Sequence, residues 1–148
     1  MRTLVIFCSL ALLVACAKNQ GNEKKVSTFS SDDSHNNGQN CMTCHVSNGG
    51  GEGWFTAAGS VYKQDLTSPN PGCTVNLYSE PNGGGSIKAT LQVDKVGNFY
   101  TTENIEWGSG LYPAIKNGVG TEKFMSSKIT TGACQSCHGT TTDKIWVD

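Results

Sequence analysis

Short runs of alternating apolar and polar residues, separated by clusters of glycine, proline and asparagine, fill the middle of the chain. This pattern is typical of strands in an antiparallel sandwich. The runs lie at 55–63, 73–79, 86–94, 98–102 and 111–116. Eighteen glycines in 148 residues also favour turns over helices. The sequence therefore predicts an all-β fold, a small antiparallel β-sandwich with little helix, whose core lies near 54–117.

One run contains a cysteine that is separate from the paired ones. Cys73, Val75 and Leu77 alternate with polar residues and so share one face of the strand. A free cysteine on such a face behaves as a small apolar side chain. We therefore predict that Cys73 is a core residue.

The same stretch is similar to the carboxypeptidase-regulatory-like, or transthyretin-like, β-sandwich family. The similarity rests on four segments in the family's order, namely Gly59–Tyr62, Pro71–Leu77, Gly97–Tyr100 and Gly110–Tyr112. The resemblance implies a sandwich fold and places Cys73, where the family has alanine, in the interior. A fold of this kind indicates no chemistry by itself.

Two segments outside the strand-rich region follow the pattern C-x-x-C-H. This pattern marks covalent attachment of c-type haem. Two intervening residues let both thiols reach the vinyl groups at one haem edge, and the next residue offers its imidazole to the iron. The sequence therefore predicts two covalently bound c-type haems. The attachment sites would be Cys41, Cys44, Cys134 and Cys137, with His45 and His138 as the proximal iron ligands.

The paired cysteines are also compatible with zinc or with disulfides. The four thiols could form a tetrahedral zinc site, which would make the chain a zinc-clipped structural module. A zinc site does not account for the histidine that follows each second cysteine. A disulfide within each pair is typical of thioredoxin-like proteins, whose βαβ context is missing here.

Candidates for the sixth, distal iron ligand are few. The chain has three histidines, so His35 is the remaining imidazole. It precedes Cys41 by six residues, which span at most about 20 Å. His35 could thus serve its own haem or the neighbouring one, and we expect the neighbouring one; a solvated histidine is the alternative. Met125 is a candidate distal ligand for the other haem. Met42 is a poorer one, because it lies between the two attachment cysteines and its side chain is badly directed. The more common role for a methionine such as Met125 is an ordinary core or surface position.

The first residues have the features of an export signal. Thr3–Ala15 is apolar, follows Arg2 and is shorter than the about 20 residues of a membrane span. Leu13–Cys16 resembles the lipobox of bacterial lipoproteins. The resemblance implies a signal peptide at 1–15, lipidation of Cys16 and an anchor at the outer membrane, facing the periplasm or the exterior. The polar segment 16–33 is predicted to be a flexible tether, and 34–148 the haem-binding domain.

These features favour an electron carrier over an enzyme. Acidic residues slightly outnumber basic ones, 12 to 11, and no basic patch for nucleic acid is present. The chain resembles dihaem c-type cytochrome lipoproteins, which implies electron exchange with other redox proteins at a membrane. A haem-based peroxidase or small-ligand sensor with one open iron site is the alternative.

Exposed haem faces would need apolar cover. We therefore expect the two haems to lie side by side at one end of the sandwich. The aromatic residues available to line that site are Trp54, Phe55, Trp107, Tyr112 and Trp146.

Overall fold

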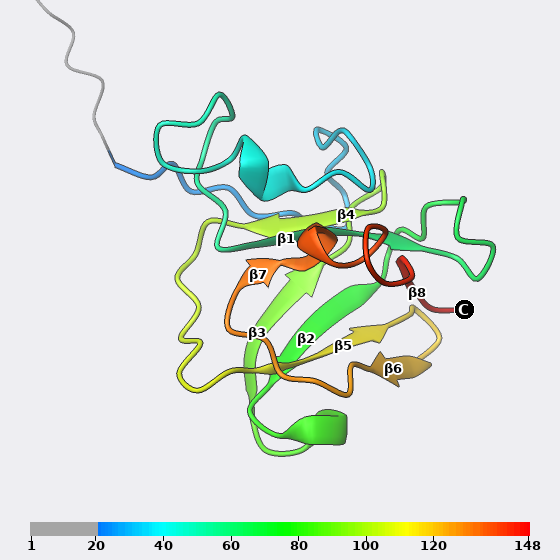
Figure 1. Cartoon of the computed structure of the whole chain (residues 1–148). Coiled ribbons are helices and arrows are strands. Elements are labelled where there is room, and N and C mark those ends of the chain that lie inside the picture. Colours follow the sequence, from blue (N-terminus) through cyan, green and yellow to red (C-terminus); the bar gives the residue numbers. More distant parts are fainter. Residues whose placement is uncertain (1–20) are drawn as a thin grey trace, which may run out of the picture.

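Figure 1 shows a computed structural model of the chain, in which residues 21–148 are described. Eight strands form two sheets, and three 3-10 helices of three residues each are the only helices in this range. The prediction of a small all-β fold with little helix is confirmed. Within the same residues, no helix has the length and apolarity that a membrane crossing requires.

The first sheet is built around β1 (Ala57–Tyr62). On one side, β4 (Asn98–Thr101) pairs with it antiparallel. On the other side, the two-residue strands β7 (Gly132–Ala133) and β8 (Ile145–Trp146) pair with it in parallel. This sheet is therefore mixed, whereas the sequence predicted only antiparallel pairing. The parallel pairs arise because the segment with the second C-x-x-C-H motif returns along β1 (Figure 1).

The second sheet is antiparallel throughout, in the order β3-β2-β5-β6. Its strands are β3 (Ile87–Gln92), β2 (Thr74–Tyr78), β5 (Tyr112–Lys116) and β6 (Glu122–Phe124). All five predicted strands occur, and their ends differ from the predicted ones by at most two residues. Strands β6 and β7 were not predicted, because two or three residues are too few to show an alternation.

The two sheets face each other across one apolar core. Val61 and Phe99 come from the first sheet, and Val75 and Leu91 from the second. Cys73 belongs to the same cluster and is 1% exposed, which confirms its prediction as a core residue. Burial raises the pKa of its thiol to about 11.

Residues before the first motif also pack on the first sheet. Val26 forms a β-bridge with Thr101, and the buried Ser27 hydroxyl donates to the Gln92 carbonyl at 2.6 Å. This part of the predicted 16–33 tether is therefore part of the folded domain. The predicted signal peptide, 1–15, and the predicted lipidation site, Cys16, lie outside the described residues.

All six residues of β1 are buried, because both faces of the strand are covered. The core covers one face. The loop before the first motif lies against the other, where the Gly38 amide donates to the Ser60 hydroxyl at 2.8 Å. The strand thus connects the core with both C-x-x-C-H segments, each of which contacts it.

Candidate functional site: two matching cysteine–histidine turns

The two C-x-x-C-H motifs share one backbone conformation. In each, a 3-10 helix begins at the first cysteine, as η1 (Cys41–Thr43) and η3 (Cys134–Ser136). In both motifs the histidine amide donates to the carbonyl of the first cysteine at 3.0 Å. The hydroxyl before the second cysteine, Thr43 or Ser136, donates to the carbonyl three residues earlier at 2.8 or 2.6 Å. Each motif therefore presents two thiols and one imidazole from a single turn.

Within each motif the two cysteines differ in exposure. Cys41 and Cys134 are half-buried, whereas Cys44 and Cys137 are exposed, and none of them forms a disulfide with another described cysteine. Burial raises the pKa of the Cys41 thiol. Burial, with a smaller effect from nearby Cys41, raises the pKa of Cys134 to about 12. The half-buried thiols, Cys41 and Cys134, are thus neutral at physiological pH. The effect of Cys41 on Cys134 also shows that the two motifs lie within electrostatic range of each other.

A backbone carbonyl fixes the proton position on each motif histidine. Nδ1 of His45 lies 2.9 Å from the carbonyl oxygen of Glu52, and Nδ1 of His138 lies 2.8 Å from that of Asp143. A carbonyl oxygen can only accept, so Nδ1 carries the proton in both rings. Nε2 then keeps its lone pair and is free to bind a metal ion. Metal-binding histidines commonly have this arrangement.

The glycine-rich loop after the first motif is needed for this contact. A Cβ atom at Gly51 would lie 2.7 Å from Nδ1 of His45. The loop can therefore cross the imidazole only with glycine at that position. On its other side the His45 ring stacks on Phe55, with ring centroids 4.1 Å apart.

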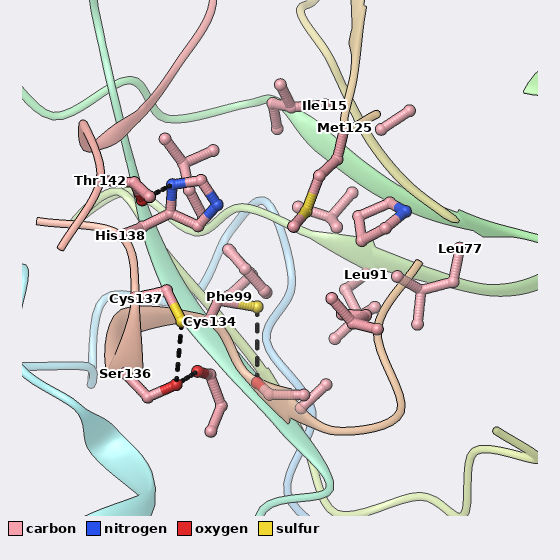
Figure 2. A pocket seen from close by; sticks show the side chains of 18 of the residues that line it. Leu77, Leu91, Phe99, Ile115, Met125, Cys134, Ser136, Cys137, His138 and Thr142 are labelled. Carbon is pink, nitrogen blue, oxygen red and sulfur yellow. Dashed lines mark hydrogen bonds between the residues drawn. The ribbon is translucent and has the colours of Figure 1, made fainter. Parts of the chain in front are cut away.

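The second motif opens into a cavity of about 450 Å³ between the two sheets (Figure 2). Cys134, Cys137 and His138 line it together with apolar side chains of both sheets. Volumes of this size are typical of sites for cofactors and other small molecules. The cavity walls include Val75, Leu77, Leu91, Phe99, Trp107 and Ile115.

Met125 lines this same cavity. In Figure 2 its sulfur points into the space that the His138 ring faces from the other side. Lys123 and Lys144 also border the cavity. The structure therefore brings Met125 and His138 to one site, as a distal ligand at the second motif requires.

His35 lies beside its own motif. Its ring centroid is 6.0 Å from that of His45. The sequence favoured the neighbouring motif, so the structure corrects that expectation. The cause is the preceding loop, which Asn98 holds on the first sheet by donating to the Ser34 hydroxyl and the His35 carbonyl at 3.0 and 3.2 Å.

The predicted aromatic lining divides between the motifs. Trp107 and Trp146 border the cavity of the second motif, and Phe55 contacts His45 at the first. Trp54 and Tyr112 do not line the cavity. The aromatic residues that were predicted to line one common site thus divide between the two motifs.

Two buried polar residues that the sequence pattern did not indicate connect the motifs. The Ser60 hydroxyl accepts a hydrogen bond from the Gly38 amide at 2.8 Å. The Ser60 backbone carbonyl accepts one from the Gln135 side-chain amide at 3.2 Å. Gln135 lies between the cysteines of the second motif, and Gly38 precedes the first. No pattern along the chain indicates this link, because it depends on the packing of three distant segments.

The donor groups fit a covalently attached haem at the second motif. Two thiols, one imidazole with a free Nε2 and an apolar cavity are the features that such a group requires. In residues 21–148, no three or more histidine, cysteine or acidic side chains come together as a metal-binding cluster. A haem iron needs only one or two protein ligands, so haem binding requires no such cluster.

Comparisons with known proteins add no relative. No protein-family model matches the chain, and searches among curated proteins and solved structures found no similar protein. The resemblances to transthyretin-like sandwiches and to cytochrome lipoproteins therefore remain resemblances.

Proposed function

We propose that the chain is a dihaem c-type cytochrome that carries electrons between other redox proteins. The observation that supports this most directly is the second motif, whose thiols and imidazole line one apolar cavity between the sheets. A bound c-type haem supplies one-electron iron chemistry, and the protein supplies its position, its surroundings and its ligands.

The proposal gives each site residue one role. Cys41 and Cys44 attach one haem, and Cys134 and Cys137 the other, through thioether bonds. At each site the histidine offers Nε2 to the iron while a backbone carbonyl holds its Nδ1 proton. Held in this way, the imidazole keeps a fixed orientation and is a stronger ligand.

Charged side chains at the cavity border suit the two carboxylates of a haem. Lys123 lies over the Trp146 ring, and Lys144 lies over the Tyr62 ring. Burial lowers the pKa of Lys123, against a smaller opposite effect of the Asp148 carboxylate. A carboxylate near it would relieve that cost, because an opposite charge favours the ammonium form.

The location of the protein is part of the proposal. Leu13–Cys16 has the residues of a lipobox, and a lipid on Cys16 would hold the domain at the outer membrane. Anchoring would bring the haem domain to redox partners at the same surface.

Haem content tests the proposal. We expect the full chain, produced in a host with c-type haem maturation, to carry two haems that survive denaturing electrophoresis. C41A/C44A and C134A/C137A should each retain one haem, whereas C73A, the matched control at a buried cysteine, should retain two. Colourless protein that contains zinc would refute the proposal. Two haems with strong carbon monoxide binding by the reduced protein would favour the peroxidase or sensor alternative.

A further inference from the structure

A second imidazole, that of His35, lies close to the His45 ring. Two imidazoles that bind one ion from opposite sides, through bonds of about 2.0–2.1 Å, have ring centres about 6 Å apart. The centroids of His35 and His45 are 6.0 Å apart. Nε2 of His45 is free because Nδ1 donates to Glu52. No side-chain hydrogen bond or ion pair within residues 21–148 engages the His35 imidazole.

The position of His35 is fixed by bonds on both sides of it. Before it, the Ser34 hydroxyl accepts from Asn98 at 3.0 Å. After it, the Asn37 side chain donates to the Val96 carbonyl at 2.7 Å, and the Gly38 amide donates to Ser60 at 2.8 Å. These bonds hold the backbone on both sides of His35, while its own side chain is exposed.

At the second motif the candidate for the same role is a sulfur atom. Residues 21–148 contain two methionines, Met42 and Met125, and only Met125 lines the cavity that His138 faces. Its backbone amide donates to the Pro113 carbonyl at 2.9 Å, next to the end of β6. A thioether is uncharged and needs no deprotonation to bind a metal ion, so it suits this apolar cavity.

We infer that the two irons have unlike ligands: His35 with His45 at the first motif, and Met125 with His138 at the second. This inference rests on the proposed function and assigns the sixth ligand of each site. Methionine ligation and an apolar site both raise a haem reduction potential. With these ligands the second site would have the higher reduction potential.

Spectroscopy of the oxidised dihaem protein tests the ligand assignment. We expect a methionine–iron charge-transfer band and near-infrared magnetic circular dichroism signals of one His/His and one His/Met haem. M125L should abolish the methionine band, and the matched control M42L should retain it. M125H keeps a ligand in place, so it should abolish the band, remain low-spin and lower only the higher of the two reduction potentials.

The first site has its own test. H35G should convert one haem to high spin, and added imidazole should restore the low-spin spectrum. Two haems without a methionine band, a band lost in M42L, or an H35G spectrum identical to wild type would each overturn the ligand assignment and leave the dihaem proposal intact. Absence of haem from the wild-type chain would refute both.

Discussion

Replacing Ser60 with alanine tests whether one buried hydroxyl anchors the loop before the first motif. Ser60 is 0% exposed. Its hydroxyl accepts from the Gly38 amide at 2.8 Å and donates to Asn98 Oδ1 at 2.6 Å. S60A leaves both groups without this partner, and each buried polar group so left costs about 1–3 kcal/mol. The Gly38 amide is only half-buried, so its cost lies at the low end of this range. For the two groups together, we expect the free energy of unfolding to fall by about 2–4 kcal/mol.

Urea unfolding followed by far-ultraviolet circular dichroism measures this change. With a slope of about 2 kcal/mol per M, the midpoint should fall by about 1–2 M. The matched control is Ser127→Ala, at an exposed serine, where the change should stay within about 0.5 kcal/mol. Equal midpoints for S60A and wild type would refute the reasoning, because the two groups would then not depend on this hydroxyl.

Three further predictions concern the packing around β1 and the core. A Cβ at Gly132 would overlap the Cα and Cβ atoms of Ala57, so Gly132→Ala should lower the free energy of unfolding by about 3 kcal/mol or more. The control Gly118→Ala has open space around it and should leave the free energy of unfolding nearly unchanged. Burial raises the pKa of Cys73 to about 11 from 9.0. The unfolded chain therefore loses this proton first, stability falls between about pH 9 and pH 11, and C73A should show a shallower fall in urea midpoint over that range. Oε1 of Gln135 is buried without a partner among the described residues, and its Nε2 donates to the Ser60 carbonyl at 3.2 Å. Gln135→Met removes both groups at similar volume, so the free energy of unfolding from urea titration should change by less than about 1 kcal/mol; a larger loss would show that the amide matters more than its geometry indicates.

Local pattern was sufficient to predict the central strands but not how they close into two sheets. The alternation around Val75 and Leu77 places β2 correctly, because each side chain's face follows from its position along the strand. The short strand β7 depends on pairing with β1, which is far away in the sequence. Pairing over such a distance leaves no local signal.

The candidate site divides in the same way. Spacing alone identified Cys134, Cys137 and His138 as one group. The cavity between the sheets could not be predicted, since it is formed by side chains from strands on both sides. The side on which His35 lies was predicted incorrectly, because Asn98, a residue of β4, sets the course of its loop.

The geometry of the four paired cysteines also favours haem over zinc. A tetrahedral zinc site needs all four sulfurs about 2.3 Å from one ion. Cys41 and Cys134 are half-buried and Cys44 and Cys137 are exposed, on separate turns that both contact β1. In residues 21–148 these side chains do not come together as a metal-binding group. Haem attachment requires only that each pair act with its own histidine, which is the arrangement that both turns repeat.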